Sequence, residues 1–269
     1  MNGFPGIDII ERPDKPRDEG ITMMIDWGLG LGQLADLLDQ AGAYIDIAKI
    51  AVGTAALIPQ ELLAEKIRLY AHRGVTASPG GQFLEYAYTQ GRAAAFFESC
   101  QRAGFSCVEV STNEVDLDPG EKARLIRAAV DDYGFKVLGE TGSKHAASTP
   151  ETLVADARNM LDAGAWKIFV EAAECFVDGV FQRRVIDHLI RRVALSDLIF
   201  ELPGPWIKGI RDDAIHELMI WLIVELGHNV NIANLHPDRV LYLESQRRGI
   251  GVKHRQPRDI LAASKPARA

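Results

Sequence analysis

Several apolar runs of strand length in this sequence end on an acidic residue, and this pattern is the first sign of chemistry. The runs are ITMMID, which ends on Asp26, FKVLGE on Glu140, WKIFVE on Glu171 and LIFE on Glu201, and the related run CVEV contains Glu109. Short continuous apolar runs are typical of strands that are buried on both faces of a parallel sheet. Because parallel strands end at the same edge, we expect these carboxylates to share one site.

Carboxylates that share a site repel one another unless a cation compensates their charge. Carboxylate oxygens are ligands that suit Mg²⁺. We therefore predict a divalent metal site, with Mg²⁺ as the cofactor and Asp26, Glu140, Glu171 and Glu201 as its candidate ligands. The competing interpretation of each carboxylate is a salt bridge or a cap on the following helix.

Two lysines are the basic counterparts of these acids. Lys49 lies inside the apolar segment IDIAKI, and Lys144 follows Glu140 in the loop sequence ETGSK. A lysine at the end of such a strand can hold a carboxylate or phosphate, or donate a proton once burial lowers its pKa. Lys49 and Lys144 are the candidate catalytic residues, with simple solvation as the alternative for Lys144 above all.

Glycine-bearing turns and asparagines are the candidate substrate-binding groups. The turns contain Gly53 and Thr54 after the second apolar run and Gly80 and Gly81 after the third, and the asparagines are Asn231 and Asn234 in HNVNIAN. Exposed N–H groups at such turns can bind phosphate near helix N-termini, although ordinary turn geometry also explains the glycines. The first turn, GLGLG, does not fit the GxGxxG pattern, which argues against a nicotinamide cofactor.

The elements that must position these residues alternate regularly. We predict strands at 21–26, 44–50, 75–78, 106–110, 135–140, 166–171, 198–201 and 229–232, and helices at 33–41, 59–72, 83–103, 120–133, 150–163, 182–194, 207–226 and 237–247. Eight strand–helix units in about 250 residues indicate an α/β protein of the (β/α)8 TIM barrel type. An open doubly wound sheet is the competitor, but polar residues at nearly every strand end favour a closed ring.

Composition narrows the partners and the organisation. The formal net charge of −7 over 269 residues gives no general attraction to nucleic acid or to an anionic membrane, so we expect small-molecule partners. Three scattered cysteines without CxxC spacing favour a reducing cytoplasm. We predict one barrel domain over 20–252, an N-terminal arm over 1–19 and a tail over 253–269, and a homo-oligomer because barrels of this kind commonly assemble.

A set of motifs in order along the chain resembles the phosphosulfolactate synthase family. The motifs are KPRDEGITMMIDWGLGL, YIDIAKIAVGT, PGGQFLE, VEVS, GETGSK, IFVEAAE, IFELP and HNVNIANLHPDRVLYLESQRRGI. The resemblance implies a barrel lyase that adds sulfite to phosphoenolpyruvate in a Mg²⁺-dependent reaction, giving phosphosulfolactate on the path to coenzyme M. It also implies that Lys144 is the catalytic acid, that Lys49 holds substrate anions, that the glutamates hold or orient Mg²⁺, and that the glycine turns receive phosphate.

Two positions leave alternatives open. Ala173 stands where the family pattern has an arginine, and Ser143 stands where it has a lysine. The same metal site could therefore act on a different enolpyruvate-like acceptor or with a different nucleophile. A further alternative is a catalytically inactive barrel that serves as a binding protein.

Overall fold

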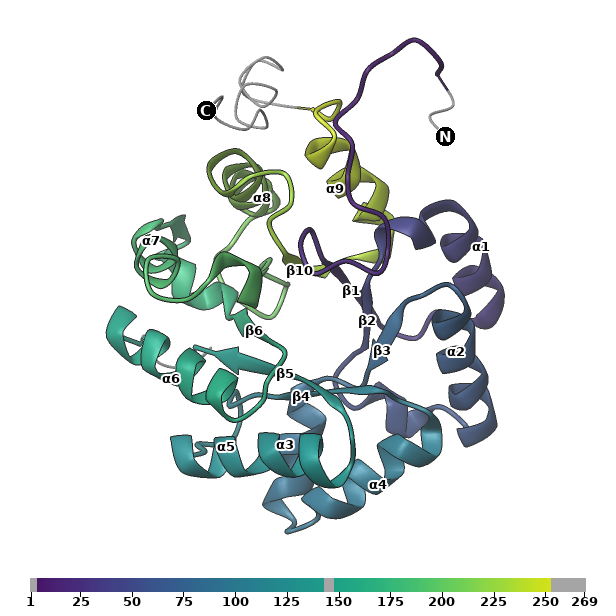
Figure 1. Ribbon diagram of the computed structural model, residues 1–269, viewed down its shortest axis with the longest axis vertical. Coiled ribbons are helices and arrows are strands. Elements are labelled where there is room, and N and C mark those ends of the chain that lie inside the picture. The colour runs from purple at the N-terminus through teal and green to yellow at the C-terminus, as the bar shows by residue number, and fades with distance from the viewer. Residues whose placement is uncertain (1–3, 143–147, 253–269) are drawn as a thin grey trace.

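The computed structural model describes residues 4–142 and 148–252, and its central feature is a ring of parallel strands (Figure 1). The strands of this ring are β1 (Thr22–Asp26), β2 (Ile47–Ile50), β3 (Thr76–Ser78), β4 (Cys107–Val110), β5 (Lys136–Thr141), β6 (Lys167–Val170), β9 (Leu198–Glu201) and β10 (Ile232–Leu235). They pair in the order β3-β2-β1-β10-β9-β6-β5-β4, and β3 and β4 lie side by side where the ring nearly closes. The predicted single-domain (β/α)8 barrel is confirmed.

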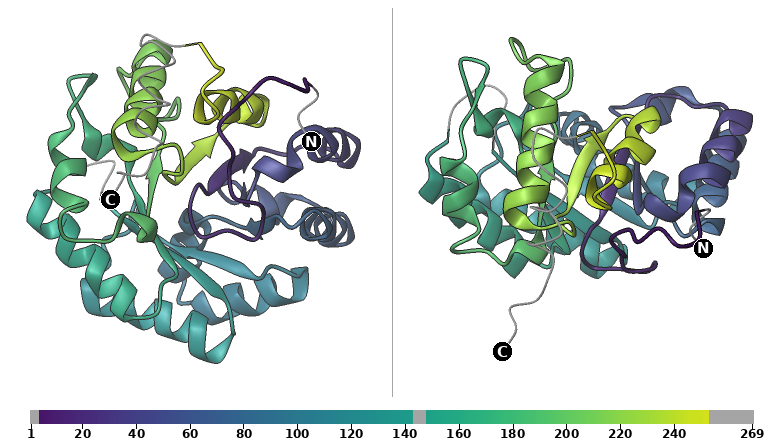
Figure 2. Two further views of the ribbon diagram at one scale, coloured as in Figure 1. Left: turned by 45° about the horizontal axis from the view of Figure 1, so that its top comes forward. Right: turned by 90° about the horizontal axis from the view of Figure 1, so that it is seen from above.

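Helices surround the ring on its outer side (Figure 2). The helices are α1 (Leu31–Ala41), α2 (Gln60–His72), α3 (Gly81–Thr89), α4 (Ala93–Ala103), α5 (Pro119–Arg127), α6 (Pro150–Asp162), α7 (Arg184–Leu189), α8 (Asp212–Leu226) and α9 (Val240–Arg247). The single helix predicted over 83–103 is wrong, because the chain breaks between α3 and α4 at Gly91, whose φ is +66°. A short hairpin of β7 (Phe176–Val177) and β8 (Val180–Phe181), absent from the prediction, follows β6.

Two apolar layers account for the continuous apolar runs. Residues of one set of strand faces pack against the helices, and the other set fills the barrel interior. The interior set is Ile21, Met23, Ile25, Ile47, Ala51, Cys107, Leu138, Phe169, Ile199 and Ala233. Such a packed interior leaves only the rims of the barrel open to a ligand, and catalytic residues of this fold lie at the C-terminal rim. No helix in the described ranges is both long and apolar enough to cross a bilayer.

The last strand begins three residues later than the sequence pattern predicts, which separates the two candidate asparagines. Asn231 precedes β10, whereas Asn234 lies inside it. The pairing of β1 with β10 shifts register between Thr22 and Met24, and Asn234 takes a φ of +61° at this irregularity. Such a bulge redirects side chains and is frequent beside active sites. Here it lets Asn234 line the C-terminal mouth of the barrel.

The described part of the predicted arm, residues 4–19, runs beside α9 and across the N-terminal ends of the strands (Figures 1 and 2). Lys15 donates to the carbonyls of Gly42, Ile45 and Arg73 at 2.6–3.0 Å, which satisfies backbone groups at helix C-termini. Burial lowers the pKa of Lys15 to about 8, although Asp46 opposes the shift. The predicted tail, 253–269, lies outside the described residues.

A fully buried arginine ties the N-terminal ends of β1 and β10 together. Arg247 donates to the carbonyls of His228 at 2.9 Å, Val230 at 2.5 Å and Ile21 at 3.3 Å. Burial lowers its pKa well below the usual value, and the neighbouring cation Arg12 adds to that effect. The guanidinium therefore stabilises the packing of β1 against β10 at the N-terminal rim of the barrel.

We expect Arg247→Met to lower the free energy of unfolding by about 3 kcal/mol or more, because three carbonyls lose a charged donor. Urea denaturation followed by circular dichroism measures the loss. The matched control is Arg102→Met, since Arg102 is 61% exposed on α4 and its change should stay within about 0.5 kcal/mol. Equal losses in the two variants would contradict the structural role of Arg247.

Candidate active site at the barrel mouth

Three glutamates from neighbouring strands converge at the C-terminal rim. Glu140 lies near the end of β5, Glu171 directly follows β6, and Glu201 ends β9. One carboxylate oxygen from each lies within 4.8 Å of those from the other two, and all three side chains are buried. This glutamate triad brings together three of the four candidate metal ligands that the sequence pattern predicts. Three buried anions at such distances favour a hard divalent cation, and their oxygens suit Mg²⁺.

Lys49 from β2 balances part of this charge. Its Nζ lies 2.9 Å from Glu109 Oε2 and 3.5 Å from Glu201 Oε1, and 4.7 Å from the centre of the Phe169 ring. Burial alone lowers the pKa of Lys49, but the carboxylates of Glu109, Glu201 and Glu140 outweigh it and raise the pKa above its usual range. The ammonium group is therefore a fixed positive charge beside the triad.

Asn113, in the loop after β4, brings a neutral oxygen to the same place. Its Nδ2 donates to Glu140 Oε1 at 2.6 Å, which fixes the orientation of that carboxylate. Its Oδ1 is buried, and no residue of the described ranges donates to it. A buried acceptor without a donor is costly, and a bound cation, water or ligand donor would satisfy it. The donor set thus fits a hard cation.

Glu85 on α3 organises the loop that carries Asn113. This buried carboxylate accepts hydrogen bonds from the N–H groups of Asn113, Glu114 and Val115 at 2.6–3.0 Å, and from the Ser111 hydroxyl. Four donors on one carboxylate satisfy it without a cation. Glu85 is therefore a positioning residue: it affects the mouth by holding the loop that carries Asn113, and we assign it no contact with substrate.

Two glycines allow α3 to begin against β4. Gly80 has a φ of +79°, and a Cβ on Gly81 would lie 2.9 Å from Glu109 Oε1 and would overlap the Ser111 side chain. Both glycines line a mouth cavity of about 590 Å³ together with Lys49, Glu109, Asn113, Glu140, Glu201 and Asn234. The volume suits a small-molecule ligand. We call this space the mouth cavity.

Some predicted site residues lie elsewhere. Asp26 is not a member of the triad: it pairs with Lys66 at 2.7 Å and accepts from the Tyr70 hydroxyl at 2.6 Å and from the N–H groups of Gly28 and Leu29. These contacts match the competing interpretation, a salt bridge and a turn cap. We assign Asp26 no part in the proposed metal site.

Asn231 lies at the opposite rim. It accepts from the N–H of Ile21 at 2.9 Å and donates to the carbonyls of Ser196 and Leu198. Its polar atoms thus form hydrogen bonds with backbone groups before β1 and around the start of β9, and we assign it no substrate contact.

Gly53 and Thr54 follow β2 but do not line the mouth cavity. The two residues before them, Ala51 and Val52, do line it.

Lys144, the candidate acid, lies outside the described residues, as does Ser143. The described chain resumes at Ser148, whose N–H and hydroxyl donate to Glu174 at 3.1 and 2.6 Å.

Cys175 offers no nucleophile, because burial raises the pKa of its thiol to about 12, with Glu174 and Glu171 adding to the rise.

Sequence reasoning missed Glu85, Asn113 and the indoles of Trp27 and Trp206 as site residues. Trp27 directly follows β1 and Trp206 follows β9, so position after a strand was the available signal for both. Glu85 and Asn113 carried no such signal, because a helix side chain and a loop amide meet only after α3 packs on β4.

The fold and the mouth define a (β/α)8 barrel whose C-terminal rim carries three buried carboxylates that could hold a cation, and this fold supports many chemistries. The family model for (2R)-phospho-3-sulfolactate synthase (ComA) matches residues 10–252, and the chain belongs to that family. The phosphosulfolactate synthase of Methanothermobacter thermautotrophicus is 31% identical over 250 residues, covering 89% of this chain and 92% of its own. Protein HEAT-STRESS-ASSOCIATED 32 of Arabidopsis thaliana is 24% identical over 274 residues, covering 91% of each chain.

Among solved structures, 2,3-dimethylmalate lyase, a member of the PEP mutase/isocitrate lyase superfamily, superposes with a TM-score of 0.52. The two chains are 17% identical, and the match covers 91% of this chain and 89% of the other. At this identity the likeness concerns the barrel alone.

We expect Glu85→Ala to lower the free energy of unfolding by about 3 kcal/mol, because four donors lose their common acceptor. The same variant should weaken Mn²⁺ binding, measured by electron paramagnetic resonance, since Asn113 no longer holds Glu140. The control is Glu98→Ala, which removes an exposed carboxylate on α4 that does not line the mouth cavity. Unchanged Mn²⁺ affinity in a folded Glu85→Ala protein would refute its positioning role.

A second expectation concerns the triad. At a Mg²⁺ concentration about one hundred times its Kd, the unfolding midpoint of the native protein should rise by roughly 5 °C or more. Glu171→Gln should abolish most of this rise, because it removes one of the three anionic ligands. Asp26→Asn is the comparison: it should lower stability without Mg²⁺ yet leave the Mg²⁺-dependent rise intact. The reverse pattern would assign the metal to Asp26.

Proposed function

We propose that this protein is a lyase of the phosphosulfolactate synthase type, which adds sulfite to phosphoenolpyruvate. The observation that carries the proposal is the buried triad of Glu140, Glu171 and Glu201, with Lys49 beside it, in a chain of this family. In the reaction, a sulfite electron pair forms a bond to the methylene carbon. The double-bond pair moves toward the adjacent carbon, which then receives a proton.

The triad would hold Mg²⁺, and Asn113 would add a neutral oxygen beside Glu140. When bound, Mg²⁺ supplies stabilisation for the negative charge that grows on the substrate carboxylate during attack. The chain's own contribution is orientation: β5, β6 and β9 are hydrogen-bonded neighbours, so the three carboxylates keep their spacing. Such preorganisation avoids rearrangement during the reaction.

Lys49 would attract the substrate anions. Its Nζ is held between Glu109 and Glu201, and its alkyl chain lies close to the Gly80 turn. A fixed ammonium group at this point offsets carboxylate repulsion toward an incoming anion. The Gly80–Gly81 turn, at the start of α3, would place N–H groups toward phosphate.

Lys144 would deliver the proton to the carbon next to the attacked methylene. It follows Glu140 by four residues, and the resemblance of GETGSK to the family pattern supports this assignment. A lysine in a water-poor site can act as an acid when its pKa is lowered toward neutrality.

A different nucleophile is the second candidate. Ala173 donates its N–H to Glu171 at 3.1 Å but offers no charge to an anion, where the family pattern has arginine. A mouth with one cation fewer holds sulfite less strongly and tolerates another reactant. The heat-stress-associated relative from Arabidopsis thaliana is consistent with roles in the family beyond the synthase, and a binding protein without activity remains the third candidate.

The test incubates the purified protein with Mg²⁺, phosphoenolpyruvate and sulfite, and follows sulfite consumption. We expect turnover that Lys144→Ala reduces by about 10²-fold or more, the usual loss for a missing general acid. The matched control is Lys136→Ala, since Lys136 is exposed at the opposite rim and stacks over Trp166.

Three outcomes separate the candidates. Turnover that depends on Lys144 supports the proposed lyase. If sulfite is not consumed but phosphoenolpyruvate raises the unfolding midpoint in the presence of Mg²⁺, a different nucleophile is favoured. If neither phosphoenolpyruvate nor sulfite changes the unfolding midpoint, the proposed lyase is wrong and the catalytically inactive barrel is favoured.

A further inference from the structure

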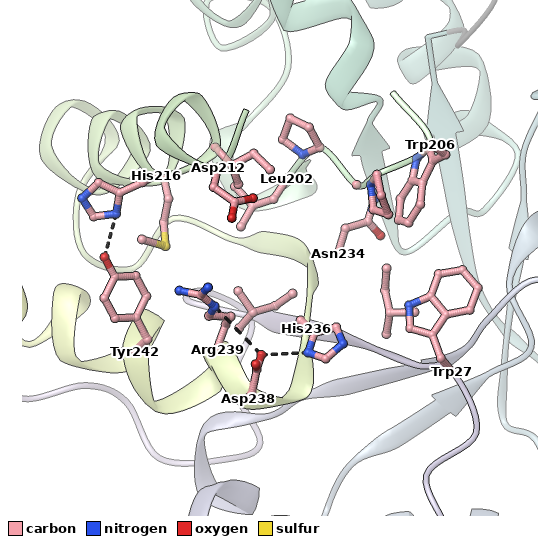
Figure 3. A pocket seen from close by; sticks show the side chains of 17 residues that line it. Trp27, Leu202, Trp206, Asp212, His216, Asn234, His236, Asp238, Arg239 and Tyr242 are labelled. Carbon is pink, nitrogen blue, oxygen red and sulfur yellow. Dashed lines mark hydrogen bonds and ion pairs between the residues drawn. The ribbon is translucent and has the colours of Figure 1, made fainter. Parts of the chain in front are cut away.

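A second cavity of about 430 Å³ adjoins the mouth on the side of the last strand (Figure 3). We call it the side cavity. It is open to solvent on one side and is lined by residues of the loop Leu202–Trp206 after β9, of α8 and of the segment from Asn234 to Tyr242. Figure 3 shows Trp27, Trp206 and Asn234 toward one end, and His216 with Tyr242 at the other.

The lining of the side cavity differs from that of the mouth. Its walls include Leu202, Pro203, Pro205, Met219 and Leu235, and no residue of the glutamate triad. Burying an anion against apolar walls is costly without several donors. The walls therefore suit an uncharged organic group better than phosphate or sulfite.

Polar and charged side chains also line this cavity, and the cation Arg239 is one of them (Figure 3). The Tyr242 hydroxyl and His216 Nδ1 are hydrogen-bonded at 2.7 Å, and His236 Nδ1 lies 2.7 Å from Asp238. Asp212 projects from α8 toward the cavity (Figure 3). Arg239 Nε lies 4.0 Å from Asp238, so this carboxylate offsets the charge of the guanidinium, and Asp212 leaves the lining with an excess of negative charge. The hydroxyl and imidazole can orient a neutral polar end group.

The two cavities share a wall. Ile25, Trp27, Trp206 and Asn234 line both of them. The Trp27 and Trp206 rings meet edge to face, with centroids 5.9 Å apart, and the residues are 47% and 40% exposed. Because both indoles line both cavities, a ligand in the mouth cavity that contacts them can extend along them into the side cavity.

We propose that the side cavity binds the apolar organic body of a nucleophile that reacts at the mouth, so that the enzyme accepts an organic nucleophile in addition to sulfite. This inference rests on the proposed function, because it assumes an enolpyruvyl acceptor beside the triad. The two spaces divide the ligand by polarity: charged groups face Glu140, Glu201 and Lys49, and the organic body faces Trp27, Met219 and Leu235.

The chemistry needs no further co-reactant. The lone pair of the nucleophile forms a bond to the methylene carbon of the acceptor, and the double-bond pair moves to the adjacent carbon. One proton is added there, and the nucleophile loses its own proton if it carries one. No oxidation or reduction occurs, and the product carries the organic body on the carbon that was attacked.

The test uses stable 2-oxo acids as probes of that skeleton, with Mg²⁺ present. Pyruvate has the carboxylate and the adjacent oxygen only, while phenylpyruvate carries an apolar ring on the carbon that is attacked in the reaction. We expect phenylpyruvate to bind roughly ten-fold tighter than pyruvate, measured by isothermal titration calorimetry. A metal-free arm uses 4-fluorobenzyl alcohol, whose ¹⁹F signal should broaden when the protein is added.

Two variants fill the side cavity from α8: Met219→Trp and, one helical turn earlier, Ile215→Trp. Either should remove the preference for phenylpyruvate and the ¹⁹F broadening, while the Kd of pyruvate stays unchanged. Met219→Leu is the matched control, because it conserves volume and should keep both effects. Unfolding midpoints identify a variant that fails to fold, and the second filling variant then decides the outcome.

The possible results separate this inference from the function on which it rests. If pyruvate binds in a Mg²⁺-dependent way but phenylpyruvate binds no more tightly, the proposed role of the side cavity is wrong, and the proposed lyase function is unaffected. A preference that survives both filling variants also overturns it. If pyruvate does not bind but 4-fluorobenzyl alcohol does, the enolpyruvyl site fails, and with it the link between the side cavity and a reactant.

Discussion

The mutual repulsion of buried carboxylates at one rim of the barrel is the constraint on which the site depends. Glu140, Glu171 and Glu201 are brought within 4.8 Å by strands that are fixed neighbours in the sheet. Within the described residues, the ammonium group of Lys49 offsets part of this negative charge, because it forms ion pairs with Glu109 and Glu201. The rest of the charge favours a divalent cation, and a bound metal would relieve the repulsion that weakens the fold there.

Supporting contacts lie at a distance from the chemistry. Glu85 gathers the loop after β4, and this loop presents Asn113 to Glu140. At the other rim, Arg247 and Asn231 satisfy backbone groups around β1, β9 and β10. The barrel thus separates the two tasks that its fold allows, stability at the N-terminal rim and reactivity at the C-terminal rim.

Two adjoining cavities with different linings meet at Ile25, Trp27, Trp206 and Asn234. The mouth cavity is lined by Lys49, Glu140 and Glu201, whereas apolar residues form much of the wall of the side cavity beside Trp27 and Trp206. Ala173, in the turn after β6, removes a charge that the family pattern includes. Both features lie outside the glutamate triad, so under the proposed function each would affect the choice of reactant without changing the proposed metal ligands.

The sequence by itself determined the alternation of strands and helices, the barrel, and the convergence of three glutamates, because strand-end carboxylates of parallel neighbours must meet at one rim. It also indicated Lys49, a charge within an apolar run. Tertiary structure alone decided that Asp26 pairs with Lys66 and that Asn231 and Asn234 lie at opposite parts of the barrel. It also revealed Glu85, Asn113 and the side cavity. These outcomes depend on contacts between segments far apart in the chain and on a register shift in β10, and local residue patterns carry no record of either.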